Sequence, residues 1–166
     1  VGDGELKPFA TVQFFGKAIG RIGEHFAMIP SANLRFVFGE NIPITYANVI
    51  GGMIEGRYCE QQIPFMGITN ASFMRNYVIN ANLDFRYRFL RNNYITLSAQ
   101  YIRDFKSFKE FYEAPEVIRG YTLPQNVFGA GIEYAYDSII GPIRANIHWS
   151  NLYNKFGAYV SIGFDF

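Results

Sequence analysis

The chain has 166 residues, enough for one domain, and it is 49% apolar with an aromatic share of 18%, which excludes an intrinsically disordered protein. The formal net charge is +1 and charged residues are spread along the chain, so no basic patch indicates a nucleic-acid partner. No window approaches the ~20 consecutive apolar residues of a membrane helix, so any membrane crossing must use strands.

Two strands are predicted near the N-terminus, at residues 9–22 and 33–40. In the first, Ala10, Val12 and Phe14 alternate with polar residues, and the second continues this period of two. No signal segment precedes the first residue, so we expect that an export signal has been removed or lies further upstream.

The clearest alternation lies in the predicted strand at residues 73–90. Its apolar positions are Tyr77, Ile79, Ala81, Leu83, Phe85, Tyr87 and Phe89. Polar or charged residues fill almost every position between them. This pattern exceeds the ~10 residues that a tilted strand needs to cross a bilayer, so it predicts a membrane-crossing strand.

Four further strands are predicted by the same rule, at residues 94–104, 127–137, 142–150 and 156–166. Long and short connections alternate between the strands, with long ones at residues 41–70 and 105–126 and tight turns at 91–93 and 138–142. Outer-membrane barrels have this alternation, with long extracellular loops and short periplasmic turns. About seven strands are predicted, whereas bacterial barrels usually close with an even number. Either a strand near residues 42–46 escapes the pattern, or the chain is part of a larger barrel.

A soluble lipid-binding barrel has its apolar side chains inside, whereas a membrane barrel has them outside. The polar face of these strands carries charged residues that could pair across a polar lumen, so it favours the membrane barrel. Aromatic residues also gather toward the strand ends, as in an interfacial girdle. We therefore expect a polar network facing the lumen, formed by Asp84, Arg86, Arg88, Glu133, Arg144 and His148. The alternative is a conduction path lined by arginines, including Arg103.

The end of the chain resembles a known family. The run Ser138-Ile139-Ile140-Gly141-Pro142-Ile143-Arg144, followed by a strand and a terminal strand ending at Phe166, is similar to the end of the bacterial surface-antigen barrels of outer-membrane assembly factors. Within this family the chain is most similar to the barrel fused to patatin-like phospholipases of Bacteroidetes-type bacteria. The resemblance implies an all-β, antiparallel transmembrane barrel, of which this chain is the C-terminal portion, with about sixteen strands in all.

The resemblance also implies a long extracellular loop that folds inward, at the segment containing Gly51, Gly52, Arg57 and Tyr58. The family's loop signature, an apolar residue followed by Arg-Gly-Tyr, occurs instead at Ile118 with Arg119, Gly120 and Tyr121. Position in the chain favours Arg57 over Arg119 as the arginine of the inward loop.

The terminal strand resembles a recognition signal for the barrel-assembly machinery. Its apolar residues stand at alternate positions back from a C-terminal aromatic: Ala158, Val160, Ile162, Phe164 and Phe166. Ordinary lipid-facing side chains would give the same pattern, and both roles can hold together.

Catalysis is not expected in this chain. It contains no G-x-S-x-G nucleophile elbow, so the catalytic domain of any lipase would lie upstream. His25 and His148 are far apart with no ligand-type neighbours at metal-binding spacing, so neither a metal nor another cofactor is expected.

The sequence therefore predicts a barrel of a Gram-negative outer membrane that anchors an upstream domain of the same polypeptide or serves as its translocation pore. Expected partners are outer-membrane lipid, lipopolysaccharide, the barrel-assembly machinery and the upstream domain, and not nucleic acid. One alternative is an autonomous small barrel with a structural or adhesive role. The other is a soluble lipid-binding barrel.

Overall fold

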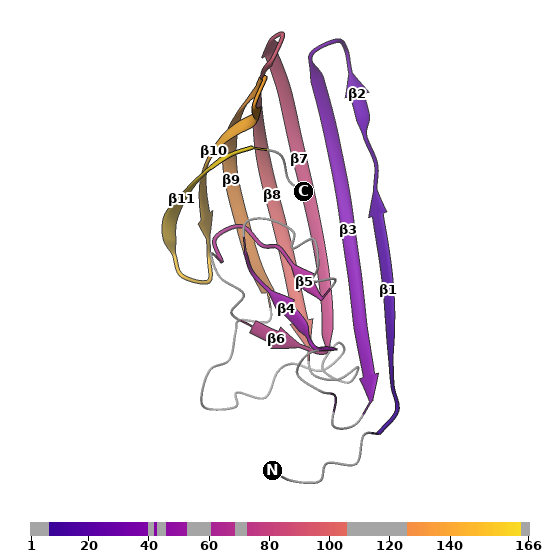
Figure 1. Ribbon diagram of the computed structural model, residues 1–166. Coiled ribbons are helices and arrows are strands. Elements are labelled where there is room, and N and C mark those ends of the chain that lie inside the picture. The colour runs from indigo at the N-terminus through magenta and orange to yellow at the C-terminus, as the bar shows by residue number, and fades with distance from the viewer. Residues whose placement is uncertain are drawn as a thin grey trace.

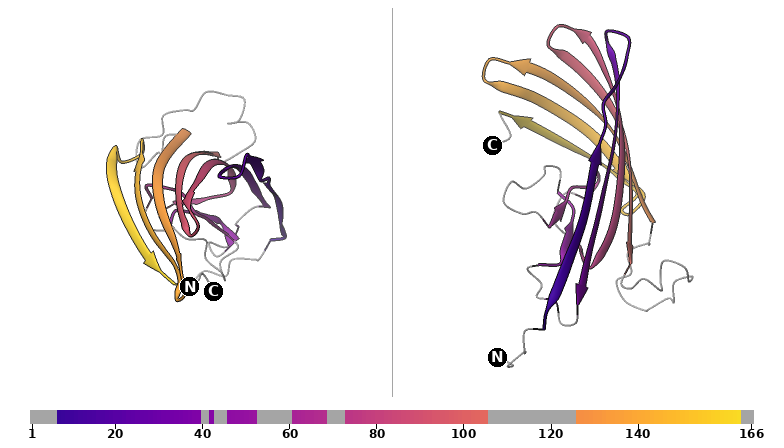
Figure 2. Two further views of the ribbon diagram at one scale, coloured as in Figure 1. Left: turned by 90° about the horizontal axis from the view of Figure 1, so that it is seen from above. Right: turned by 90° about the vertical axis from the view of Figure 1, so that its right-hand side faces the viewer.

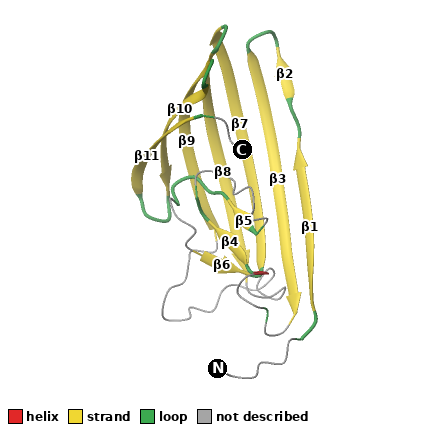
Figure 3. Ribbon diagram, in the orientation of Figure 1, coloured by secondary structure: helices red, strands yellow, loops and turns green. Residues whose placement is uncertain are grey.

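The computed structural model describes residues 7–39, 42, 46–52, 61–68, 73–105 and 126–163. These residues form an eight-stranded sheet and a separate three-stranded sheet, as Figures 1 and 3 show. In the described parts of the chain, no helix is long and apolar enough to span a membrane. The prediction of an all-β, antiparallel architecture is confirmed.

The large sheet is antiparallel and its strands follow chain order, except that the three strands of the small sheet come between its third and fourth strands in the chain. Its strands are β1 (Phe9–Lys17), β2 (Gly20–Ile22), β3 (Phe26–Gly39), β7 (Tyr77–Leu90), β8 (Asn93–Phe105), β9 (Asn126–Ser138), β10 (Gly141–Ser150) and β11 (Lys155–Ile162). Figure 2 shows the sheet curled into a trough, with β1 and β11 at its two free edges. The β7 strand covers the alternating positions from Tyr77 to Phe89, but it begins four residues after the start of the predicted strand 73–90.

The N-terminal strands differ from the prediction. The segment 9–22 is broken between β1 and β2, and β3 begins at Phe26 rather than at residue 33. The prediction was wrong there because Pro30 argues against a central strand. The carbonyl of Pro30 accepts a hydrogen bond from Ala18 N at 3.0 Å, so its missing N–H also faces the β1 side of the ladder. That is where β1 and β2 are interrupted, as expected for a residue that has no N–H to return a hydrogen bond to Ala18 O.

The outer face of the sheet is apolar and exposed. One row crosses four strands in register, from Phe85 to Leu97, Ile132 and Ile147. Leu97, Ile132 and Ile147 are 53%, 47% and 57% exposed. A continuous exposed row of this kind suits a lipid environment and argues against the soluble alternative, whose apolar side chains would be enclosed.

Aromatic rings gather near both ends of this outer face. At one end Tyr77 stacks on Phe105, with ring centroids 5.6 Å apart, and at the other end Phe89 lies 6.3 Å from Tyr134. Tyr77 and Tyr87 lie on the same face of β7, and a rise of about 3.4 Å per residue with a tilt of about 45° separates them by about 24 Å along the membrane normal. The height agrees with the apolar band of an outer-membrane barrel, which is about 25 Å.

The small sheet lies within the trough (Figures 1 and 2). It consists of β4 (Asn48–Ile50), which pairs in parallel with β5 (Gln62–Ile63) and antiparallel with β6 (Phe73–Arg75). These strands fall in or beside the segment that the sequence predicts as a loop, and they add no strand to the large sheet. The predicted strand 73–90 is divided at Asn76, because β6 belongs to the small sheet.

Candidate functional site: a loop docked on the inner face

The polar face of the large sheet is its inner face, on which the small sheet lies. Residues 46–52 and 61–68, called the docked loop here, cover part of this face. Ile50, Ile63, Phe65 and Ile68 of the docked loop form a buried cluster with the inner-face residues Val78, Ile102 and Val127 of β7, β8 and β9. The docked loop thus packs against the apolar end of the inner face.

Gln100 of β8 holds the docked loop by its backbone. Its Oε1 accepts a hydrogen bond from Met66 N at 2.9 Å, and its Nε2 donates to Pro64 O at 2.8 Å. The same Nε2 donates to Asn80 Oδ1 at 3.1 Å, which orients the amide from the neighbouring strand. A side-chain amide that accepts from one peptide group and donates to another replaces the partners that an extended segment would find in a sheet.

Small residues let the docked loop approach the wall. A Cβ added at Gly67 would lie 2.6 Å from Ser150 Cβ, and one added at Gly129 would lie 2.9 Å from Met66 O. Gly131 has Met66 Sδ within 3.0 Å of the same hypothetical position. Side chains at these positions would push the loop off the sheet.

The base of the docked loop is held by Asn48, which is fully buried. Its Oδ1 accepts a hydrogen bond from the guanidinium of Arg35, and its Nδ2 donates to Arg35 O and Asn76 O, each at 3.0 Å. Because Arg35 is itself only 6% exposed, this pairing satisfies charged and polar groups that burial would otherwise penalise.

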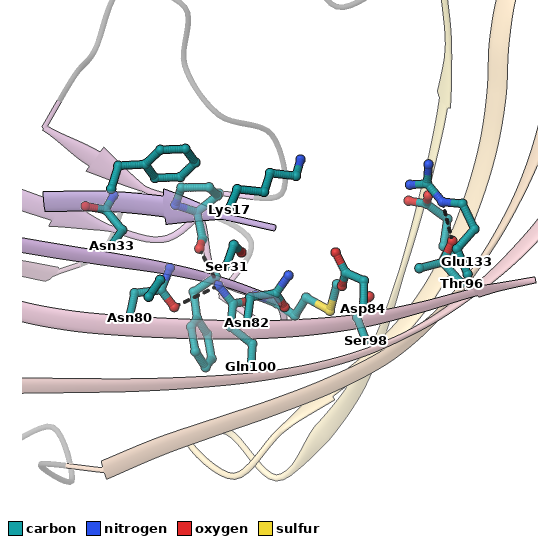
Figure 4. A pocket seen from close by; sticks show the side chains of 17 residues that line it. Lys17, Ser31, Asn33, Asn80, Asn82, Asp84, Thr96, Ser98, Gln100 and Glu133 are labelled. Carbon is teal, nitrogen blue, oxygen red and sulfur yellow. Dashed lines mark hydrogen bonds between the residues drawn. The ribbon is translucent and has the colours of Figure 1, made fainter. Parts of the chain in front are cut away.

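Beyond the loop, the inner face encloses a polar cavity of about 280 Å³, drawn in Figure 4. Amide, hydroxyl and charged side chains from five strands line it: Lys17, Ser31, Asn33, Asn80, Asn82, Asp84, Arg86, Thr96, Ser98, Gln100 and Glu133. Phe15 and the loop residues Gly52, Pro64, Phe65 and Met66 complete the lining.

The structure brings part of the predicted polar network together in this cavity. Asp84, Arg86 and Glu133 all line it, and Arg86 Nε donates to Thr96 Oγ1 at 3.3 Å. Arg88 lies apart, at the turn end of the sheet, where its guanidinium donates to Glu24 O at 3.1 Å.

Arg144 and His148 lie on the inner face of β10, because they are in register with Ala135 and Gly131 of β9. His148 is 2% exposed, and its Nδ1 lies 2.8 Å from Asn146 Oδ1. Arg103 does not belong to an arginine-lined conduction path on the inner face. It is in register with Ile79, so it lies on the outer face of the sheet.

The loop-motif residues are only partly described. Gly51 and Gly52 lie in the docked loop with φ of 120° and 93°, a backbone conformation that a side chain would strain. Arg57, Tyr58, Arg119, Gly120 and Tyr121 lie outside the described residues, so the choice between the two arginines stays a prediction.

The C-terminal residues Ala158, Val160 and Ile162 lie on the outer face of β11, in register with Ile147, Ala145 and Ile143. Phe164 and Phe166 lie outside the described residues. In the parts of the chain that the structure describes, His, Cys, Asp and Glu form no group suited to a metal ion.

Gln100 and Asn48 are the functional candidates that the sequence did not reveal. Gln100 reads as one more polar position in an alternating strand, and Asn48 as one residue of a long loop. The run Pro64-Phe65-Met66-Gly67 is apolar although it lies in a loop, and this is a sequence signal that the loop packs against another surface.

Two comparisons with known proteins bear on this site. A family model described as the OMP85 superfamily matches residues 4–166. No curated protein matches the chain.

Proposed function

As the chain belongs to the OMP85 superfamily, we propose that its large sheet is the C-terminal wall of an outer-membrane barrel that anchors an upstream domain of the same polypeptide. Superfamily members are outer-membrane proteins of Gram-negative bacteria. The upstream domain that the terminal motif suggests is a patatin-like lipase, and the complete barrel would have about sixteen strands.

The docked loop is the observation that carries the anchor role. It occupies the inner face through the paired hydrogen bonds of Gln100 and through a buried apolar cluster, so it stands in the way of free passage along that face. The exposed apolar row of the outer face, with the exposed rings of Phe89 and Tyr134 at one of its ends, offers the lipid contact that an anchor needs.

A translocation pore is the second candidate, and the polar cavity beside the docked loop favours it. Amide, hydroxyl and charged side chains line that cavity, and they would suit a wet path if the loop left its seat. The two functions differ in how often the path is open, which an electrical measurement resolves.

The experiment begins with the native full-length protein in outer-membrane fractions, run on gels with and without boiling. A heat-shifting band is the expected result, because it indicates a folded barrel, and a mass well above that of a barrel of about sixteen strands indicates a further domain. A signal in the soluble fraction would overturn the barrel proposal. The purified protein is then placed in planar bilayers, where an anchor gives rare, brief conductance and a pore gives sustained conductance.

A further inference from the structure

The outer face of the large sheet has an apolar hollow of about 330 Å³, at the lower end of the range of ligand pockets. Side chains of β7, β8 and β9 line it: Ala81, Leu83, Ala99, Tyr101 and Phe128. The two alanines are short and exposed, and the rings of Tyr101 and Phe128 lie 4.9 Å apart at its border. An acyl chain lying in such a hollow makes more contacts than one lying on a flat surface.

A cation and an amide lie beside one end of the hollow. Arg103 follows Tyr101 on the outer face of β8, two residues or about 7 Å further along the strand. Its neighbour in register on β9 is Asn126. The Oδ1 of Asn126 accepts a hydrogen bond from the Tyr101 hydroxyl at 2.7 Å, so Nδ2 is the group of this amide that can donate to a ligand.

The depth of Arg103 in the membrane suits a lipid headgroup. It is in register with Ile79, two residues from Tyr77 at the end of the apolar band, which places it about 5 Å inside that end. An arginine on the lipid side costs little near the interface, in contrast to the middle of the bilayer. Its guanidinium has five N–H donors in a fork that matches phosphate, so it can hold a phosphate as well as a protein contact.

This end of the sheet carries the long connections. Residues 40–76 separate β3 from β7 and residues 106–125 separate β8 from β9, whereas residues 91–92 and 139–140 form tight turns at the other end. Long connections of outer-membrane barrels are extracellular, so Arg103 and the hollow belong to the outer leaflet. That leaflet consists of lipopolysaccharide, whose lipid A part carries phosphate groups above several acyl chains.

We propose that this part of the outer face binds one lipid A unit of lipopolysaccharide. A phosphate of the lipid accepts hydrogen bonds from Arg103 and Asn126, and an acyl chain lies in the hollow. The order along β8 agrees with the order of groups in the lipid, because Tyr101 and Ala99 lie about 7 and 14 Å from Arg103 toward the middle of the apolar band. The inference rests on the proposed function, since the outer face must meet lipid, and it deepens that function by naming the lipid.

The test is native mass spectrometry of the full-length protein, extracted from outer membranes into detergent. The added lipids are lipid A, lipid A from which the phosphate has been removed, and phosphatidylglycerol. We expect one lipid A to stay bound to each protein, with an affinity about tenfold higher than that of the dephosphorylated form, because hydrogen bonds to the charged guanidinium are lost with the phosphate. Phosphatidylglycerol, a phosphate lipid with fewer acyl chains, should also bind more weakly.

Two variants of the site have matched controls. Arg103→Gln should weaken binding of lipid A about tenfold, whereas Arg91→Gln, in the turn at the opposite end of the sheet, should leave it unchanged. Ala99→Phe fills the hollow and should weaken binding about tenfold, the effect of about two lost methylene contacts. Its control is Ala145→Phe, since Ala145 is exposed on the outer face of β10, outside the hollow.

Every variant is first checked for the gel shift on boiling. If Ala99→Phe loses the shift, Ala81→Leu takes its place, because it narrows the same hollow. A protein that keeps its gel shift but retains no lipid A would overturn the lipid site and leave the barrel intact, whereas a native protein found in the soluble fraction would overturn both.

Two further results would overturn the proposal. Equal loss of lipid A in Arg103→Gln and Arg91→Gln, or in Ala99→Phe and Ala145→Phe, would place the binding elsewhere. Binding of dephosphorylated lipid A or phosphatidylglycerol as tight as that of lipid A would mean that the hollow does not select the lipid of the outer leaflet.

Discussion

Replacing Gln100 by leucine tests whether this one amide keeps the docked loop on the inner face. The variant leaves Met66 N–H and Pro64 C=O without their hydrogen-bond partners, at distances that are 2.9 and 2.8 Å in the native chain. Each unpaired buried group costs about 1–3 kcal/mol, and because the loop contacts are partly buried we expect a total of about 2–4 kcal/mol. The fraction of molecules with the loop undocked should therefore rise by about 30-fold to 1000-fold.

Hydrogen exchange read by mass spectrometry measures this opening. Amides of residues 61–68 should exchange faster in Gln100→Leu by that factor, while the β9 and β10 strands keep their protection. Gln13→Leu is the matched control, because Gln13 also lies on the inner face but makes a single exposed hydrogen bond of 3.4 Å, to Asn33. Unchanged exchange at residues 61–68 in a folded Gln100→Leu protein would refute the reasoning, as would equal acceleration in both variants.

Three other changes test the lipid face, the loop seat and the terminal strand. Leu83→Arg, near the middle of the apolar band between Tyr77 and Tyr87, should destabilise the barrel by about 2–4 kcal/mol in urea titrations in lipid vesicles, with Leu83→Ala as the control for lost volume. Gly67→Ala should accelerate exchange of the docked loop, because the new Cβ would lie 2.6 Å from Ser150 Cβ, and Ser150→Gly should restore the rate only in part, because Gly67 has a φ of 84° that strains any side chain. Deletion of Phe166 should lower outer-membrane insertion, measured by fractionation, far more than Phe128→Ala does.

Each of these expectations has a contrary outcome. Equal stability of the arginine and alanine variants would mean that the outer face does not meet lipid. Failure of the glycine substitution at residue 150 to rescue the loop would mean that another contact sets its position. Equal insertion of the two phenylalanine variants would remove the assembly signal from the terminal strand.

The strands and their two faces were predictable because alternation is a local property of the extended backbone. Along β7 every second side chain from Tyr77 is apolar, and no distant residue is needed to see it. The prediction was wrong for the start of β3, where a proline argues against a strand that the structure nevertheless contains. Pro30 lies inside β3 because its missing N–H faces the β1 side, where the pairing is interrupted between β1 and β2, and not the continuous pairing with β7.

The candidate site was predictable only in its composition. The sequence placed Asp84, Arg86 and Glu133 on polar faces, and the cavity brings these three together. It could not show that Arg88, on the same face of the same strand as Asp84 and Arg86, lies beyond the cavity, because the extent of the cavity depends on the neighbouring strands and on the docked loop.

The amino-acid sequence by itself determined that this chain forms antiparallel strands with one apolar and one polar face, since the side-chain period of two follows from the backbone alone. Only the tertiary structure decided what lies on the polar face. Gln100 meets Pro64 across 36 residues of chain, and Gly67 meets Ser150 across 83. Such contacts depend on strand register and on the path of the loop into the trough, which no local pattern encodes.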